Sequence, residues 1–411
     1  MQYRLLALSL ALGLALLPPA RAQLPGTVKI GVLNDMTGPF ADQSGKGSVV
    51  AAAMAAEDFA AEGAAPFKVE IISGDHQNKP DVGSGIAREW IDRDGVDAIA
   101  DVPNSAVGLA VNQVMREKHR TFLATNVGTS DLTGKFCSPD TVQWTMDSWA
   151  DGSSAARAMM RRGENTWFFI SFNYAFGAAL QRDATAMLEK LGGKVLGSVK
   201  HPLGTTDFSS YLVQAQSSGA KVVALADTGT DLSNAVKQAS EFGLTQKQKF
   251  DALFALITDV EAIGLQSAQG MIVTESFYWD LDDATRAFGR RFAKRFGGKM
   301  PTSNQAGVYS QVLAYLHAVK AANTIEGEKV VAEMRRAPIQ DKLFGTVTVR
   351  PDGRAIHAMH VFQVKAPAQS HEHWDVYDKL ADIPAEQAFR PLDEGGCPLV
   401  AHASAEGVKR Q

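Results

Sequence analysis

The sequence contains only two cysteines, Cys137 and Cys397, among 411 residues. Zinc clusters need closely spaced thiolate ligands, so this spacing excludes a metal centre of that kind. In an exported protein a single distant pair is most simply one disulfide, which here would tie the C-terminal region to the middle of the chain. Two free thiols are the alternative.

Long apolar runs are also scarce. One run, residues 5–17, follows Arg4 and precedes Ala20 and Ala22, which have the spacing of a signal-peptidase site. We therefore predict a signal peptide over residues 1–22 and an exported mature chain. No later stretch approaches the roughly 18 continuous apolar residues of a membrane-spanning helix.

An excess of charge of one sign is missing as well. The chain has 41 Lys and Arg residues against 45 Asp and Glu residues, a formal net charge of -4. This balance gives no electrostatic reason to expect nucleic acid or an anionic membrane as a partner. Hydrophobic residues make up 45% of the chain and charged residues 21%, which is typical of a globular protein, and the length is sufficient for two domains.

Motifs of common catalytic and cofactor sites are absent. The sequence has no Walker loop, no G-x-S-x-G and no H-E-x-x-H. Residues 45–47 lack the third glycine of a dinucleotide-binding turn because Val50 takes its place. Residues 371–373, His-Glu-His, have no third metal ligand at useful spacing, so a solvated loop is favoured over a metal site. We expect neither a cofactor nor a metal.

An enzyme is nevertheless one of the hypotheses. Asp35, Asp75 and His76 follow apolar runs and are candidate acid/base groups of a hydrolase. Helix capping or the lining of a polar pocket is the alternative, and no nucleophile lies nearby in the sequence.

Short apolar runs alternate with amphipathic segments along most of the chain. This order predicts parallel sheets with helices on both faces, and its repetition predicts an α/β fold of two doubly wound lobes. The expected strands and helices alternate over residues 28–33, 47–61, 69–72, 82–91, 96–102, 105–115 and 121–125, and, after 142–146 and 153–162, over 167–170, 180–191, 195–199, 211–216, 222–226, 232–242, 250–254 and 271–277.

The remaining segments differ in kind. Residues 284–296 and 306–322 are long helical patterns that we expect to cover the first lobe. Residues 344–349 and 357–364 flank Pro351-Asp352-Gly353 and predict a hairpin, and an irregular tail follows from Pro367. The predicted organisation is a first lobe of residues 27–146 and 281–343, a second lobe of residues 147–280 and 344–365, and a C-terminal extension of residues 366–411.

The stretch from residue 96 to residue 131 predicts half of a ligand pocket. Two apolar runs each end in a polar turn, and the polar turns of neighbouring parallel strands meet at one edge of a sheet. Backbone N–H groups at the start of the helix between them favour a small anion. Side-chain donors would come from Asn104, Ser105, Asn126, Thr129 and Ser130. The alternative for each is a helix cap.

Several motifs resemble the periplasmic Leu/Ile/Val-binding proteins of ABC transporters. The first strand runs into Asn34-Asp35-Met36-Thr37-Gly38-Pro39, as in the N-terminal signature of that family. Tyr174-Ala175-Phe176-Gly177 resembles its tyrosine-glycine turn, and residues 207–210 resemble its D-F-S motif. Residues 222–226 and 235–239 are similar to a strand and helix of its second lobe. The resemblance covers roughly residues 29–322.

The resemblance implies two lobes joined by three crossings, periplasmic location, and closure over a small solute that a membrane permease then receives. We expect a monomer. By position, a ligand carboxylate would meet the turn Asn104-Ser105-Ala106 and the turn Asn126-Val127-Gly128-Thr129-Ser130. The second lobe would contribute Tyr174 or Phe176, with Asp227, Thr228 and Phe254.

One departure concerns the ligand. Amino-acid binders of this family place an acidic side chain against the ligand ammonium, because an unpaired buried cation is costly. Here residues 252–256 offer an apolar tip, although Asp227 is a possible substitute. Aromatic residues including Trp149, Tyr278 and Trp279 suit an organic acid or amide, with core or hinge packing as the alternative. A ligand-sensing module is a further hypothesis.

Overall fold

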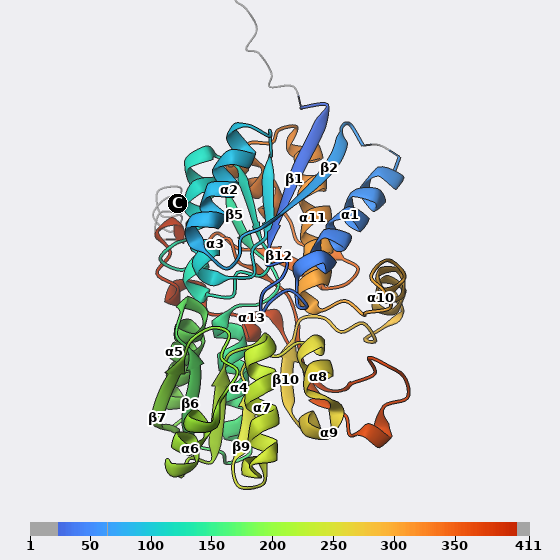
Figure 1. Ribbon diagram of the computed structural model, residues 1–411. Coiled ribbons are helices and arrows are strands. Elements are labelled where there is room, and N and C mark those ends of the chain that lie inside the picture. The colour runs from blue at the N-terminus through green and yellow to red at the C-terminus, as the bar shows by residue number, and fades with distance from the viewer. Residues whose placement is uncertain (1–23, 64, 401–411) are drawn as a thin grey trace, which may run out of the picture.

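The computed structural model describes residues 24–63 and 65–400. Two lobes lie one above the other, with the chain passing between them (Figure 1). The predicted signal peptide, residues 1–22, and residues 401–411 of the predicted C-terminal extension lie outside the described residues. No described helix is long and apolar enough to cross a membrane.

The first lobe is built on a five-stranded parallel sheet in the order β2-β1-β3-β4-β5. Its strands are β1 Thr27–Asn34, β2 Lys68–Asp75, β3 Ala98–Asp101, β4 Thr121–Ala124 and β5 Thr141–Gln143. Its helices are α1 Gly45–Ala61, α2 Pro80–Asp92, α3 Ser105–Lys118, α10 Asp283–Arg295, α11 Ser303–Ala322 and α12 Gly327–Arg335.

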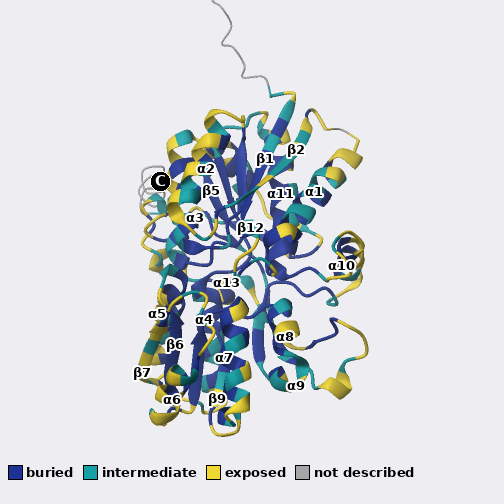
Figure 2. Ribbon diagram, viewed as in Figure 1, coloured by how far each residue is buried: buried dark blue, intermediate teal, exposed yellow. Residues whose placement is uncertain are grey.

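Successive side chains of each strand point to opposite faces of the sheet, and helices cover both faces. Val28, Ile30 and Val32 of β1 belong to the same buried core cluster as α1 and α11. Leu33 packs in the cluster of α2 and α3 on the other face. Figure 2 shows the inner strands of this sheet buried, the edge strand β2 partly exposed and the outer helix faces exposed, the pattern of a sheet covered on both sides.

The second lobe repeats this plan with a four-stranded parallel sheet in the order β7-β6-β8-β9. Its strands are β6 Thr166–Phe172, β7 Lys194–His201, β8 Val222–Ala226 and β9 Lys249–Ala252. Its helices are α4 Ser148–Arg161, α5 Ala175–Lys190, α6 Ser209–Ser217, α7 Gly229–Glu241, α8 Ile257–Ile263 and α9 Leu265–Ala268. The α/β fold of two doubly wound lobes is confirmed.

The C-terminal region differs from the expectation in two ways. Of the predicted hairpin, β12 Gly345–Val349 pairs with β13 Ala355–Ile356, but β14 Met359–Val364 leaves it. β14 lies between β10 Ile272–Glu275 and β15 Tyr377–Ile383 in an antiparallel sheet. The tail expected to be irregular therefore contains a strand, whose Tyr377 ring stacks on Phe362 of β14 at 5.2 Å. The shorter elements are β11 Ile339–Asp341, α13 Ala385–Ala388, and the 3-10 helices η1 Ser130–Thr133, η2 Leu244–Gln246, η3 Pro367–Gln369 and η4 Leu392–Glu394.

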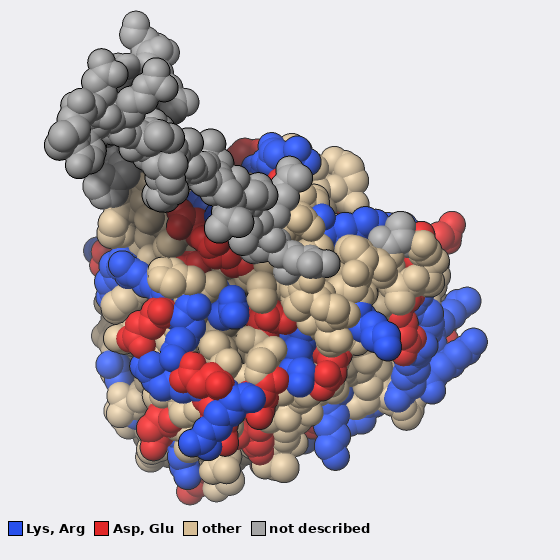
Figure 3. Space-filling view, turned by 90° about the horizontal axis from the view of Figure 1, so that it is seen from above, with Lys and Arg blue, Asp and Glu red and all other residues tan. Residues whose placement is uncertain are grey.

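The surface carries both signs of charge side by side. Seen from above, Lys and Arg alternate with Asp and Glu over the face that Figure 3 shows. This distribution agrees with the balanced composition and gives the described face no continuous basic track for a nucleic acid.

The packing of α11 on the first sheet depends on a glycine. A Cβ atom at Gly307 would collide with the Thr145 side chain and come within 3.0 Å of Thr125 Cγ2. We expect Gly307→Ala to lower the free energy of unfolding by about 1 to 3 kcal/mol, the usual effect of overpacking, as measured by urea denaturation.

Gly85→Ala is the matched control for this prediction. Gly85 is also helical, in α2, but nothing lies within 4 Å of an added Cβ atom. This variant should gain up to about 1 kcal/mol from helix propensity. Equal effects of the two variants would contradict the packing of α11 described here.

Candidate ligand site between the lobes

Buried polar side chains join the carboxyl ends of three strands in the first lobe. The Asp101 carboxylate at the end of β3 accepts hydrogen bonds from the side-chain amides of Asn34 and Asn126. Burial raises the pKa of Asp101 to about 7. Asp101 and Val102 have φ values of 81° and 62°, a left-handed conformation that is uncommon for residues other than glycine. Pro103 directly follows this bend and lines the space between the lobes together with Asn126, which follows β4.

The two polar turns predicted from the sequence lie together at this edge, and several of their groups bond to one another. Asn104 Oδ1 accepts hydrogen bonds from the N–H groups of Ala106 and Val107 at 3.0 and 3.2 Å, so it caps α3. Ser105 Oγ accepts from the Thr129 N–H at 3.1 Å. The cap is thus observed for Asn104, and the turns form a rigid unit.

A narrow space lies between the lobes, with a volume of ≈ 10 Å³, which is room for about one water molecule in this form. Six of the residues predicted for the site line it: Asn126, Gly128, Tyr174, Phe176, Thr228 and Phe254. Five further lining residues were not predicted: Phe40, Gln43, Pro103, Met146 and Asn304. Phe40 and Gln43 follow the N-terminal signature motif and Pro103 precedes Asn104, so local sequence offered a signal for these three. Met146 and Asn304 come from segments that only the fold brings to the cleft.

Other predicted residues lie outside this space. Trp149 packs under Arg157, whose guanidinium carbon is 5.3 Å from the ring centroid. The Tyr278 hydroxyl donates to the Trp374 carbonyl at 3.0 Å, so this side chain contacts the C-terminal region. Ser130 Oγ donates to Asp183 Oδ2 at 2.7 Å, and Val127 packs against Gly108.

The structure is a closed form, because side chains bridge the lobes beside the pocket. Gln43 Nε2 of the first lobe lies 2.6 Å from Thr228 Oγ1 and 3.1 and 3.0 Å from the two Asp259 oxygens of the second. Gly229, with φ 67°, lies so close to the first lobe that an added Cβ atom would be 2.6 Å from the Pro39 carbonyl oxygen. On the other side, Arg182 pairs with Asp131 at 3.1 Å.

Three acidic side chains of the second lobe, Asp227, Asp231 and Asp259, lie near the cleft but do not line the pocket. Asp227 is fully buried, 3.4 Å from His201 Nε2, and burial raises its pKa to about 6. Asp231 accepts from the Gly204 N–H at 2.8 Å. Asp259 accepts from the Leu256 N–H at 2.8 Å as well as from Gln43, and burial raises its pKa to about 6.

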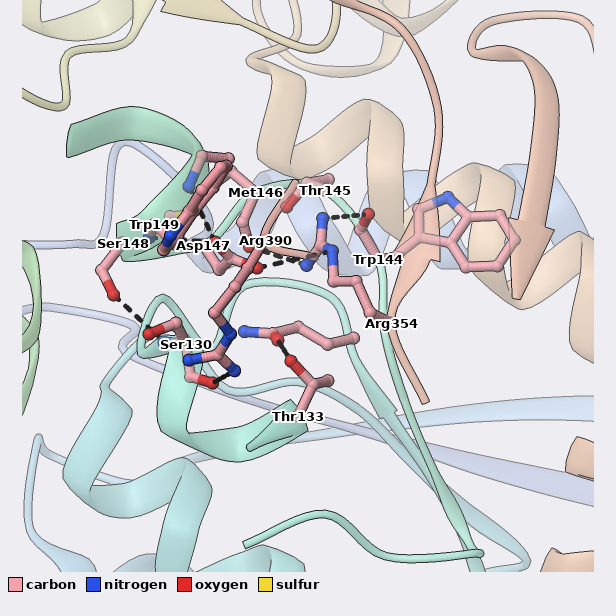
Figure 4. Close-up of polar contacts among 12 residues, drawn as sticks. Ser130, Thr133, Trp144, Thr145, Met146, Asp147, Ser148, Trp149, Arg354 and Arg390 are labelled. Atoms are coloured by element: carbon pink, nitrogen blue, oxygen red, sulfur yellow. Dashed lines mark hydrogen bonds and ion pairs between the residues drawn. The ribbon is translucent and has the colours of Figure 1, made fainter. Parts of the chain in front are cut away.

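The chain first passes from the first lobe to the second between β5 and α4, and side chains from later in the sequence contact this segment (Figure 4). Arg354 donates to the carbonyl oxygens of Met146 and Trp144 at 3.0 and 2.9 Å. Arg390 donates to the Ser130 carbonyl at 2.9 Å, and its segment is linked to the same wall by the Cys137–Cys397 disulfide, with an S–S distance of 2.00 Å. The C-terminal extension therefore braces one side of the cleft.

Asp35 and His76, which were candidate acid/base groups, bond to the loops that follow β1 and β2. Asp35 accepts from the N–H groups of Gly38 and Phe40 at 2.7 and 2.9 Å and from Asn78 Nδ2 at 2.8 Å. Desolvation lowers the pKa of His76 to about 4, and its Nδ1 accepts from the Asn78 N–H at 3.0 Å. Across residues 24–63 and 65–400, no three His, Cys, Asp or Glu side chains are placed to hold a metal.

A family model described as periplasmic binding protein matches residues 27–370. The chain belongs to this family. The resemblance found in the sequence motifs is confirmed, and with it the role of a solute-binding protein of the ABC-transporter type.

Solved structures and a named relative agree with this membership. This periplasmic binding protein is similar to one from Burkholderia mallei, with 42% identity, a TM-score of 0.87, and coverage of 91% of this chain and 99% of that one. It is also similar to a branched chain amino acid ABC transporter periplasmic ligand-binding protein from Burkholderia xenovorans LB400, with 40% identity, a TM-score of 0.81, and coverage of 90% and 99%. The Leu/Ile/Val-binding protein homolog 6 of Brucella abortus (strain 2308) is 24% identical over 346 residues, 82% of this chain and 87% of that protein.

The raised pKa of Asp259 makes stability depend on pH. Burial holds the proton on Asp259 in the folded protein up to about pH 6, whereas the ordinary pKa of an aspartate, which applies in the unfolded chain, is 3.8. This group therefore lowers the free energy of unfolding as the pH rises from about 4 to about 6. We expect Asp259→Asn to flatten the stability profile over this range, as measured by urea denaturation at each pH.

Asp94→Asn, which changes an exposed loop carboxylate, serves as the control. The difference between the Asp259→Asn and wild-type profiles should exceed the corresponding difference for Asp94→Asn. Parallel profiles for all three proteins would show that Asp259 is not a buried carboxylate of the folded state.

Proposed function

We propose that this periplasmic binding protein captures a small organic solute with an apolar body in the space between its lobes and presents it to the permease of an ABC importer. The observation that carries the proposal is that both lobes line one small space. The first lobe supplies Asn126 and Gly128, and the second supplies Tyr174, Phe176 and Phe254. The space is narrow in this form, ≈ 10 Å³, so a solute enters while the lobes are apart and the walls then close around it.

The apolar character of the solute follows from the aromatic wall. Phe176 and Phe254 meet edge to face with centroids 5.7 Å apart, and Phe40 and Met146 complete the surface. Such side chains bury the apolar body of a ligand, and each polar group fixes its orientation.

Binding proceeds in two steps in this proposal. The open form exposes the rigid turns of the first lobe, where the solute binds first. Rotation at the crossings then brings Phe176 and Phe254 over the solute and allows Gln43 to reach Thr228 and Asp259. Closure creates the shape that a permease recognises, and the solute leaves unchanged.

A larger groove on the outer side of the first lobe is the competing location. It is lined by α1, α10, α11 and residues 339–343. Its charged groups already pair with each other, Arg291 with Asp58 and His317 with Glu62. It is also formed by one lobe only, so a solute bound there would not depend on closure.

A thermal-shift screen of amino acids, organic acids and amides tests the proposal. A solute that binds only the folded protein raises its melting temperature by mass action, and mass spectrometry should recover that solute intact. A solute converted to a product would favour the hydrolase hypothesis, and a library without any stabilising member would contradict solute binding.

Gly128 allows a close approach of the two lobes at the pocket. A Cβ atom there would lie 2.6 and 2.7 Å from the Phe176 ring. We expect Gly128→Ala to weaken binding of the best solute from the screen by about 1 to 3 kcal/mol, because Phe176 must move or the lobes must close less fully. Isothermal titration calorimetry measures this loss.

Gly26→Ala is the control, since nothing lies within 4 Å of a Cβ atom at Gly26. Its affinity should equal that of the wild type. Undiminished affinity of Gly128→Ala would place the solute elsewhere than in this space.

A further inference from the structure

The walls of the pocket carry no ionised side chain. Its lining consists of Phe40, Gln43, Pro103, Asn126, Gly128, Met146, Tyr174, Phe176, Thr228, Phe254 and Asn304. At the tip of β9, where an acidic residue would meet an amino-acid ammonium, the chain places Phe254. A charged group of a solute enclosed here would lose water without gaining a counter-charge, which is costly.

The nearest acids do not compensate for a cation. Asp259 lies behind Gln43 and Thr228 and accepts hydrogen bonds from both, at 3.0 and 3.3 Å to Oδ2. The Asp101 carboxylate accepts from Asn34 and Asn126, and Asp227 faces His201. An ammonium group would have to displace existing partners to reach Asp259 or Asp101. Asp227, whose two oxygens have no hydrogen bond among the described residues, lies outside the lining of the pocket.

The nearest basic side chains are equally committed, so an anion has no cationic partner in the wall. Arg354 is buried behind Met146, where it bonds to two backbone carbonyl oxygens and lies 4.2 Å above the Phe389 ring. Arg182 is held by Asp131, Asp183 and Ser130. The buried acids around the cleft also disfavour an anion.

Asn304 and Gly128 each leave a polar group of the wall without a partner among the described residues. Asn304, only 2% exposed, is the second residue of α11, and its Oδ1 atom has no hydrogen-bond donor among the described residues. The Gly128 N–H has no acceptor within that same part of the chain. Unpaired buried polar groups destabilise a closed form unless a ligand pairs with them. One acceptor and one donor together complement a group that both donates and accepts a hydrogen bond.

We infer that the cleft selects small uncharged carboxamides over the corresponding carboxylates and α-amino acids. The –CONH2 group donates to Asn304 and accepts from the Gly128 N–H, while the apolar body lies against the phenylalanines. This inference rests on the proposed function and names its solute class.

The test compares solutes that share one alkyl body. Isothermal titration calorimetry of the mature protein uses 4-methylpentanamide, 4-methylpentanoate and L-leucine, with benzamide and benzoate as a second pair. In the alkyl set, the aromatic set or both, the amide should bind at least tenfold more tightly than the charged solutes of the same set. Equal or tighter binding of L-leucine or of a carboxylate overturns the inference and leaves solute binding intact. The inference is also overturned if neither amide binds while another solute in the screen does. A protein that responds to no solute at all contradicts the proposed function together with the inference.

A charge-adding variant tests the assigned contact. Asn304→Asp is compatible with folding because an acidic residue at the start of a helix is favourable. It should shift the ratio of L-leucine to 4-methylpentanamide affinity at least tenfold toward L-leucine, since it supplies the missing partner for the ammonium. Asn323→Asp makes the same chemical change at the C-terminal end of the same helix and should leave the ratio unchanged. Equal ratios in both variants overturn the contact with Asn304.

Discussion

The carboxylate of Asp101 is the constraint on which the rest of the site depends. It joins Asn34 at the end of β1 to Asn126 beyond β4, so three parallel strands end at one fixed point. The chain reaches this point through the left-handed backbone of Asp101 and Val102, a conformation that persists only where surrounding contacts impose it. The turns that follow are therefore rigid before any solute arrives, which limits the ordering that binding requires.

Fewer contacts join the two lobes to each other than hold each lobe together. The bridges from Gln43 to Thr228 and Asp259, and from Ser130 and Asp131 to Asp183 and Arg182, are hydrogen bonds and a partly exposed ion pair. Each contributes a net stabilisation of only about 1 kcal/mol. A balance of this size leaves the open and closed forms close in free energy, so that a solute can shift the population between them. Arg354, Arg390 and the disulfide join the C-terminal region to the wall of the cleft in addition to these bridges.

Much of the fold could be predicted because strands buried on both faces read as apolar runs, and the alternation of runs and amphipathic helices determines a parallel sheet. The same logic located Asn126, whereas Gly128, Tyr174 and Thr228 were predicted from the resemblance to the Leu/Ile/Val-binding proteins; all four line the pocket.

Other features could not be found in this way. Met146 and Asn304 reach the pocket from a crossing and from a helix far along the chain, where no local pattern distinguishes them from core residues. Tyr278 and Trp149 were predicted for the site but do not line it. Tyr278 contacts the C-terminal region and Trp149 packs against Arg157, and neither contact can be read from the local sequence. The pairing of β14 with β10 and β15 was not predicted, because β15 lies in the polar tail that was expected to be irregular.

A crystal structure of the protein with the most stabilising solute tests the central claim most directly. Our account predicts an unmodified solute enclosed between Gly128 and Phe254, with both lobes in contact with it. A solute bound in the groove of α1, α10 and α11, or one touched by a single lobe, would contradict it.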